Sequence, residues 1–178
     1  MSLNDPRLPK LVYFVMLALG VLEWSRAYAQ LPMVMAVHFA AGGAPNGFAP
    51  KQLFFILMLV MVGLSALVAF AAPVVLASKP PERLNLPNKS YWLAPERRQE
   101  TFRVFRAQFG WFGCAVLFVL LYGTSRAMDA NLTADHRFDA MGMFYVIIGF
   151  VLFTLVWVIR FIRHFQRIPA RRIGDLQP

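Results

Sequence analysis

Apolar residues gather in four long stretches, separated by segments that are polar or mixed. Each stretch approaches or exceeds the roughly 20 residues that a helix needs to cross a bilayer. Helices are expected because backbone groups in lipid must be satisfied internally, and no alternating pattern of a barrel appears. The sequence therefore predicts an all-α integral membrane protein with four transmembrane helices in two hairpins, at residues 11–29, 53–77, 109–128 and 141–159.

Composition supports the same class of protein. Hydrophobic residues make up 58% of the 178 residues and charged residues 15%, against averages of about 45–50% and about 25% in globular domains. Cys114 is the only cysteine, so an intramolecular disulfide and a thiolate metal site are both excluded. We expect Cys114 to pack on a helix surface.

The basic residues predict the orientation. Fourteen of the 18 lysines and arginines lie before the first span, between the second and third spans, or after the fourth. By the positive-inside rule both termini are then cytoplasmic, in a multi-pass membrane protein. The net charge of +9 is mostly this topology signal. Nucleic-acid binding is disfavoured because the charge is divided among three segments without a reader motif.

The first span has a second interpretation. A basic start, an apolar run and Ala27-Tyr28-Ala29 before Gln30 are also typical of a cleavable signal peptide. Glu23 and Arg26 make an unusually charged approach to such a cleavage site. We therefore favour a retained transmembrane helix, and cleavage would not change where the later loops face.

The outer loop at residues 31–51 differs from both flanking spans. It is rich in bulky apolar side chains and carries no charge before Lys51, whereas disordered connectors are charged and poor in such side chains. A structured loop is expected, with Asn46-Gly47 forming its turn. His38 offers a hydrogen bond, and Lys51 begins the second span.

The connection at residues 79–106 is expected on the cytoplasmic side. Leu86-Pro87-Asn88 is a turn signal, and Pro95 followed by Glu96 is typical of a helix start. An amphipathic interfacial helix is predicted to run from there into the third span. This connection is expected to contact lipid head groups or an acidic partner through Tyr91, Trp92, Arg97, Arg98 and Arg103. Residues 160–178 are expected to form a basic tail on the same side.

Small residues predict where the helices pack closely, because they let helix backbones approach in lipid. Gly63, Ser65 and Ala66 form such a patch in the second span. The third span opens with Gly110, Gly113 and Cys114, and the fourth places Gly142 and Gly149 on one face.

Three charged residues near the outer ends of the spans are candidates for ligand binding. Glu23 and Arg26 lie three residues apart on one helical face, where they can neutralise each other or reach a polar outer pocket. Arg126 lies near the outer end of the third span. No catalytic motif appears. His38, His136 and an acidic residue have the chemistry of a zinc site but not its spacing, so we expect no metal and no cofactor.

The loop resembles a short domain of unknown function at the N-terminal end of bacterial SdpI-type immunity proteins. The shared pattern is Pro32, His38-Phe39, Gly43, Pro45, Asn46-Gly47 and Lys51, and the resemblance covers residues 11–70. It implies a polytopic membrane protein that protects against a toxin and signals its presence. Met33, Ala36 and Asn46 stand where the family pattern has acidic or proline residues, which weakens any role that depends on those carboxylates.

These observations lead to three functional hypotheses. The first is a non-enzymatic protein of the bacterial inner membrane that recognises a peptide, lipid or protein through its outer loop. Its expected ligand contacts are His38, Asn46, Gly47, Lys51, Glu23, Arg26 and Arg126. The second is an accessory subunit of a larger membrane complex, consistent with the 17 phenylalanines. The third is a small transporter or intramembrane enzyme, which requires one polar pocket that joins Glu23, His38 and Arg126.

Overall fold

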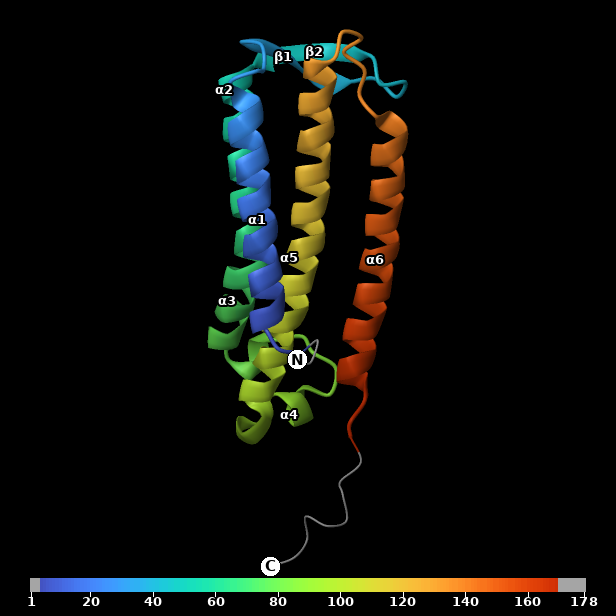
Figure 1. Ribbon diagram of the computed structural model, residues 1–178. Coiled ribbons are helices and arrows are strands. Elements are labelled where there is room, and N and C mark those ends of the chain that lie inside the picture. The colour runs from blue at the N-terminus through green and yellow to red at the C-terminus, as the bar shows by residue number, and fades with distance from the viewer. Residues whose placement is uncertain (1–3, 170–178) are drawn as a thin grey trace, which may run out of the picture.

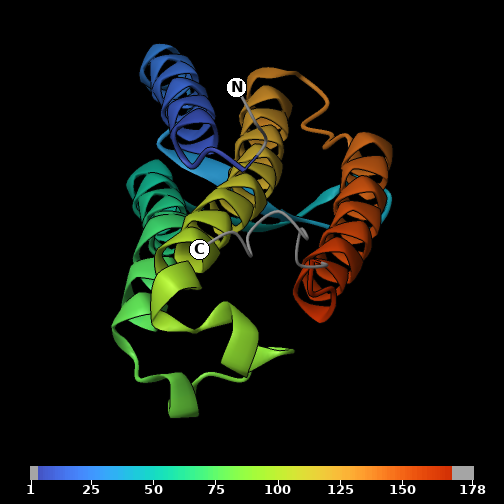
Figure 2. The ribbon, with the colours of Figure 1, turned by 90° about the horizontal axis from the view of Figure 1, so that it is seen from below.

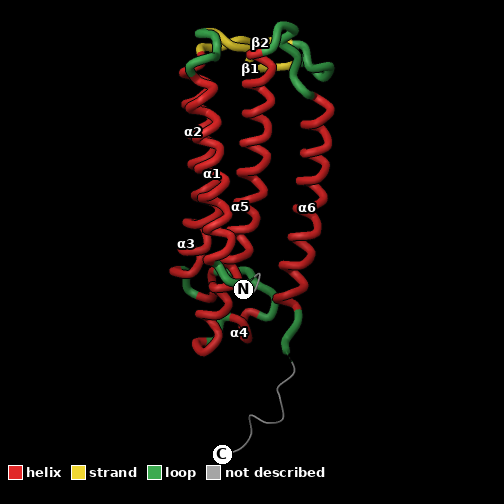
Figure 3. The backbone as a smooth tube through the Cα atoms, in the orientation of Figure 1, coloured by secondary structure: helices red, strands yellow, loops and turns green. Residues whose placement is uncertain are grey.

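The computed structural model describes residues 4–169, and residues 170–178 of the predicted basic tail lie outside that range. Long helices stand side by side, and two strands lie across one end of the bundle, the hairpin end (Figures 1 and 3). The elements are α1 (Arg7–Tyr28), β1 (Val34–Phe39), β2 (Pro45–Pro50), α2 (Lys51–Ala66), the π-helix η1 (Leu67–Ala71), α3 (Ala72–Ser78), the 3-10 helix η2 (Pro81–Arg83), α4 (Lys89–Trp92), α5 (Pro95–Leu132) and α6 (Ala140–Gln166).

Four helical segments are long and apolar enough to cross a membrane, as the sequence predicts: Arg7–Tyr28, Lys51–Ser78, Pro95–Leu132 and Ala140–Gln166. The all-α prediction is wrong at the loop between the first two spans, where β1 and β2 form a two-stranded antiparallel sheet. Val34, Val37 and Phe39 are β-branched or aromatic, and such side chains favour extended backbone.

The predicted turn at Asn46-Gly47 is also wrong. Both residues lie within β2, and the chain reverses at residues 40–44, where the Ala40 amide donates to the Ala44 carbonyl (2.8 Å). Gly43 adopts φ +82° there, a conformation that only glycine takes readily. The Gly42-Gly43 pair therefore provides the turn that the Asn-Gly pair was expected to make.

Helix α5 lies at the centre of the bundle. Figure 2 shows it between α6 on one side and α1 with α2 and α3 on the other. Close approach is possible because Gly113 faces Ala69 of η1 and Gly110 faces Pro9 of α1. The packing is thus organised around one helix instead of two separate hairpins. Gly63 and Gly149, also expected at packing faces, have open space beside them.

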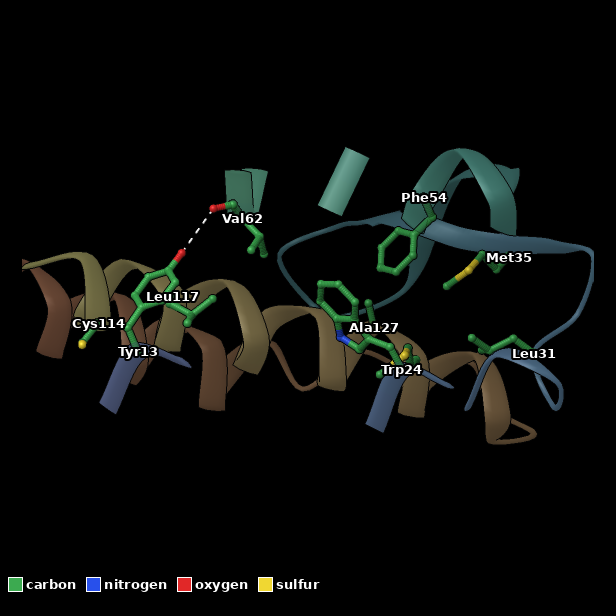
Figure 4. Packing of buried hydrophobic residues seen from close by; sticks show 10 residues of the cluster. Tyr13, Trp24, Leu31, Met35, Phe54, Val62, Cys114, Leu117 and Ala127 are labelled. Carbon is green, nitrogen blue, oxygen red and sulfur yellow. Dashed lines mark hydrogen bonds between the residues drawn. The ribbon is translucent and has the colours of Figure 1, made fainter. Parts of the chain in front are cut away.

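The main core lies between α1, α2 and α5 (Figure 4). The hydroxyl of Tyr13 is fully buried there, 2.6 Å from the hydroxyl of Ser65 and 3.2 Å from the Val62 carbonyl. The Cys114 thiol is also buried and donates to the Pro9 carbonyl (3.3 Å). Since buried polar groups need partners, these contacts fix how α1 sits against α2 and α5.

Helix α2 continues into α3 through the π-helix η1. Pro73 lies two residues after the end of η1. A proline ring clashes with the carbonyl four residues before it, and proline has no amide hydrogen to donate. A wider π turn at this point lets the helix accommodate Pro73. The span therefore stays continuous despite an interior proline.

The predicted amphipathic segment before the third span is continuous with that span. Helix α5 begins at Pro95 with Glu96 in its first turn, as expected, and runs unbroken for 38 residues. At 1.5 Å per residue it is about 57 Å long, against about 30 Å for a hydrocarbon core. The first turns of α5 thus project from the bundle as part of one rod, not as a separate helix lying in the membrane plane.

Candidate functional site

The hairpin is held on the bundle by one buried asparagine of α5. The Ala36 amide donates to Oδ1 of Asn131 (2.7 Å), and Nδ2 of Asn131 donates to the Ala36 carbonyl (2.9 Å) and the Ala127 carbonyl (2.8 Å). The side-chain amide thus pairs with β1 as a neighbouring strand would. Met35 and Ala36 are buried at this contact, so the underside of β1 is fixed against α5.

The tip of the hairpin is held by the segment between α5 and α6. The Phe138 amide donates to the Gly43 carbonyl (2.9 Å), and the Phe138 and Phe39 rings stack with centroids 4.9 Å apart. At the start of α6, Asp139 accepts from the Gly142 amide (2.8 Å) and from the Tyr122 hydroxyl (3.2 Å). The hairpin is therefore attached both to α5 and to the segment just before the start of α6.

The same segment contains a second ordered carboxylate. The Thr133 hydroxyl and the Arg137 amide donate to Asp135 and lower the pKa of its carboxyl. Asp135 is exposed and His136 adopts φ 48° beside it. Within residues 4–169 no group of three His, Cys, Asp or Glu side chains is placed to hold a metal ion.

Lys51, which follows β2, links this end of the hairpin to the end of α1. Its side chain is 8% exposed, and Nζ donates to the carbonyls of Tyr28 (2.8 Å) and Leu31 (2.9 Å). These carbonyls lie at and just beyond the end of α1, where helical backbone leaves acceptors without intrahelical donors. A cation there also complements the helix dipole. The structure therefore gives this predicted ligand residue a capping contact.

Lys51→Met is expected to destabilise the protein by about 2 kcal/mol, because two hydrogen bonds from a charged donor are lost. The measurement is unfolding of the purified protein in mixed micelles during titration with dodecyl sulfate. Lys79→Met is the matched control, since Lys79 is exposed. Equal midpoints for the two variants would refute the capping role.

A cleft of about 720 Å³ lies beneath the hairpin, between α2, α5 and α6. Its walls are mostly apolar, and its roof is the end of β1 with the first residues of the turn that follows. Met141, Phe144 and Ile147 of α6 are 60%, 54% and 45% exposed, so the cleft is open at the surface of the bundle. Its lining includes Val37, Phe39, Phe54, Met58, Leu120, Gly123, Thr124, Phe138 and Met143.

Two polar side chains line this cleft. The Thr124 hydroxyl is already bonded to the Leu120 carbonyl (2.7 Å) and to Met58 Sδ (3.2 Å). His38 is exposed, and its imidazole makes no hydrogen bond within residues 4–169. The predicted site residue His38 is thus the polar group that the cleft offers to a ligand.

Gly47 and Asn46 lie on β2 next to His38, outside the cleft lining. Gly47 pairs with His38, and a Cβ at Gly47 would lie 2.8 Å from the His38 Cβ, so glycine is what lets the imidazole occupy this position. Asn46 is exposed on β2 beside Gly47. The hairpin residues predicted to bind a ligand are therefore close to one another, with Lys51 set apart in its cap.

Glu23 and Arg26 line a different cavity. It measures about 340 Å³ and lies between α1 and α5, where Asp129 and Leu132 form the α5 wall. The cleft under the hairpin is lined by Gly123 and Thr124, which lie on another face of α5 at 100° per residue. The ion pairs within residues 4–169 are Glu100 with Arg103 and Asp129 with Arg126, so Glu23 and Arg26 do not form the anticipated pair.

Arg126 lines neither cavity. It pairs with Asp129 (2.9 Å), and its guanidinium lies 5.5 Å from the centre of the Tyr122 ring. Its Nε is buried without a partner. Glu23, His38 and Arg126 therefore do not share one polar pocket, which the hypothesis of a transporter or enzyme required.

At the opposite end, several predicted contact residues bind the chain itself. Trp92 Nε1 donates to the Phe165 carbonyl (2.8 Å), and Asn88 Nδ2 donates to the Gln166 carbonyl (2.8 Å), at the end of α6. Arg98 donates to the carbonyls of Ala77 (2.9 Å) and Lys79 (2.6 Å), at the end of α3. These contacts cap helix termini in the way that Lys51 caps α1.

Arg97 and Arg103, the other predicted contact residues at this end, lie on α5. The Arg97 guanidinium lies 4.1 Å from the centre of the Tyr91 ring. Arg103 is paired with Glu100 at 2.8 Å. Both arginines are exposed, so contact with lipid or with a partner remains open to them.

Four helices of membrane-spanning length and composition, with a structured cap between the first two, define a multi-pass membrane protein. Residues 11–62 match the model of a domain of unknown function, DUF1648. The match covers α1, the hairpin and the first part of α2, which confirms the predicted short domain near the N-terminus. No curated protein and no solved structure matches the chain significantly.

Sequence reasoning missed Asn131 and Phe138, the two residues that hold the hairpin in place. Asn131 lies near the end of α5 and is separated from Ala36 by 95 positions, so no local pattern links them. The signal in the sequence that could have identified Asn131 is a polar amide near the end of an apolar helix. Such groups in a bundle are expected to have partners.

Proposed function

We propose that this chain is a non-enzymatic protein of the bacterial inner membrane that recognises an amphipathic ligand at its hairpin end. The observation that carries the proposal is the apolar cleft of about 720 Å³ roofed by the hairpin. Ligand pockets are typically about 300–1,000 Å³, mostly apolar, with a few polar groups that fix orientation. The cleft has this character.

In this proposal the apolar part of the ligand lies between α5 and α6, and its polar part lies at the rim. His38 lines the cleft and offers a hydrogen bond to that polar part. Asn46 lies outside the cleft lining but is exposed on the neighbouring strand β2, where it offers a second contact. An outer position of the hairpin end is supported by the basic residues, which concentrate at the opposite end of the bundle. The ligand would therefore enter from the outer half of the bilayer.

The resemblance to SdpI-type proteins supports a role in immunity or signalling. A ligand in the cleft would contact Phe144 and Ile147 of α6 as well as α5. Helix α6 is a continuous rod from Ala140 to Gln166, and its far end is bonded to Asn88 and Trp92. A shift of α6 on binding would thus reach the Tyr91-Trp92 segment at the cytoplasmic end.

The test is to fill the cleft. Gly123→Phe places a ring in the space between α5 and α6, where the nearest atoms to an added Cβ belong to Met143 at 3.5 Å and beyond. The probe is a phospholipid with a photoreactive diazirine in its acyl chain, incorporated in nanodiscs with the full chain. We expect wild-type labelling to concentrate on the cleft residues and to fall about tenfold in Gly123→Phe, the equivalent of about 1.4 kcal/mol.

The matched control is Gly63→Phe, because Gly63 lies on an exposed face of α2 with open space beside it. Its labelling of the cleft should equal that of the wild type. His38→Ala and Asn46→Ala should weaken ligand binding, or protection against a membrane-active peptide, without lowering membrane levels. Unchanged cleft labelling in Gly123→Phe, with unchanged binding in both alanine variants, would contradict the proposal.

A role as an accessory subunit is the second candidate, and the exposure of α6 supports it. In the most apolar 18-residue stretch of α6, none of the residues is buried inside the bundle. In the corresponding stretch of α5, 33% of the residues are buried. Such a face contacts either lipid or another membrane protein. Purification in mild detergent distinguishes the two, since stoichiometric co-purifying subunits favour the accessory role and a lone monomer or dimer favours ligand recognition.

A further inference from the structure

A cavity of about 350 Å³ lies at the end of the bundle opposite the hairpin, against the last turns of α6. It is independent of the cleft described above. Three of its lining residues are arginines that follow at intervals of three and four, which places them on one side of the helix. The lining residues are Trp92, Arg160, Arg163, His164, Arg167 and Pro169.

These arginines are without acidic partners in the part of the chain that the structure describes. The two ion pairs there use Glu100 with Arg103 and Asp129 with Arg126. Arg160, Arg163 and Arg167 are all exposed. Three cations that share one cavity repel one another unless an anion lies between them.

The wall behind the arginines is fixed by hydrogen bonds. Trp92 is 8% exposed, donates to the Phe165 carbonyl, and lies 5.2 Å from the His164 ring between centroids. Asn88 binds the Phe165 and Gln166 carbonyls at 3.1 and 2.8 Å. Because these donors satisfy the carbonyls at the end of α6, the helix terminus presents less negative charge to an approaching anion.

Three arginines of α5, unlike those of α6, already have partners within residues 4–169. Arg98 is bonded to two carbonyls, Arg103 to Glu100, and Arg97 lies on Tyr91. The arginines of α6 also have an apolar surface beside them, since Val156 and Ile159, on neighbouring positions of the same side of the helix, are 56% and 48% exposed. A phosphate held by the arginines would thus have its acyl chains next to apolar side chains of the same helix.

We propose that Arg160, Arg163 and Arg167 bind the phosphate of an anionic phospholipid headgroup beside Trp92. Guanidinium groups donate paired hydrogen bonds to phosphate oxygens, which makes arginine suited to this ligand. Basic residues next to a membrane span attract anionic lipid, and each contributes to affinity. The exposed apolar side chains of α6 next to the cavity favour a lipid over a soluble phosphate compound.

The test uses the full chain in detergent micelles and native mass spectrometry with phosphatidylglycerol or phosphatidylcholine as the probe. We expect phosphatidylglycerol to remain bound preferentially, and the triple variant Arg160→Gln/Arg163→Gln/Arg167→Gln to bind it about 10- to 100-fold more weakly. The control is Lys79→Gln/Arg83→Gln/Lys89→Gln, which removes the same charge from exposed positions at the same end and should retain binding.

Equal losses in the two triple variants would overturn the proposal, because binding would then follow net charge and not the cavity. Full competition by glycerol phosphate, which has the headgroup without acyl chains, would overturn the assignment to lipid. If the glutamine variant fails to fold, the triple arginine-to-lysine variant decides: it keeps the charge but not the paired donors, so it should bind phosphatidylglycerol more weakly than wild type. Unchanged binding in that variant would refute recognition by guanidinium groups.

Discussion

Asn131→Leu is expected to release the hairpin from α5 and to destabilise the protein by about 2–5 kcal/mol. The substitution leaves the buried Ala36 amide and carbonyl without their partners, and each such group costs about 1–3 kcal/mol. Unfolding by dodecyl sulfate measures the total effect. Hydrogen exchange at the Ala36 amide reports the local effect, and we expect its protection to be lost while the amides of the α1–α5 core keep theirs.

The control for this variant is Asn46→Leu, because Asn46 is exposed on the same hairpin. It should leave both measurements nearly unchanged. Asn131→Asp should fall between the two, since its oxygen still accepts from Ala36 but its donations to the Ala36 and Ala127 carbonyls are gone. Retained protection at Ala36 in Asn131→Leu would show that the strand is held by other contacts.

Gly113→Ala is expected to separate α5 from η1 and to cost about 1–3 kcal/mol, the range for an overpacked core. A Cβ at Gly113 would collide with the Ala69 Cβ, and both positions are buried in the centre of the bundle. Ala69→Gly in the same chain should restore part of the loss, because it removes the methyl group on the other side. The measurement is the coupling free energy from the four unfolding midpoints of this double-mutant cycle.

Gly63→Ala is the matched control for helix propensity, since Gly63 has nothing within 4 Å of an added Cβ. Alanine is the better helix former by about 1 kcal/mol, so this variant should be as stable as the wild type or slightly more so. Additive effects of Gly113→Ala and Ala69→Gly would contradict direct packing between the two residues.

Helix starts and spans were predictable because they depend on local chemistry. Pro95 with Glu96 begins α5, and Asn88 adopts the left-handed conformation (φ 51°) expected of a turn residue. The close packing of Gly110 and Gly113 was also expected from small residues in an apolar stretch. These signals act within one or two turns of the chain.

Several predicted ligand or partner residues proved to have structural contacts. Lys51, Arg98 and Trp92 each donate to carbonyls at the end of a helix that is distant from them in sequence. An isolated basic or aromatic residue beside a span looks the same in the sequence whether it binds lipid, a partner or a helix terminus. The position of the other helix decides among these roles.

By itself the sequence determined the membrane class, the four apolar spans, the structured loop between the first two, and the expected orientation. It did so because length, hydropathy and charge distribution are properties of contiguous segments. The tertiary structure alone decided that α5 is the central helix, that Asn131 holds β1, and that the hairpin roofs an apolar cleft beside His38. These features depend on contacts between residues as far as 95 positions apart, which packing creates and no local pattern specifies.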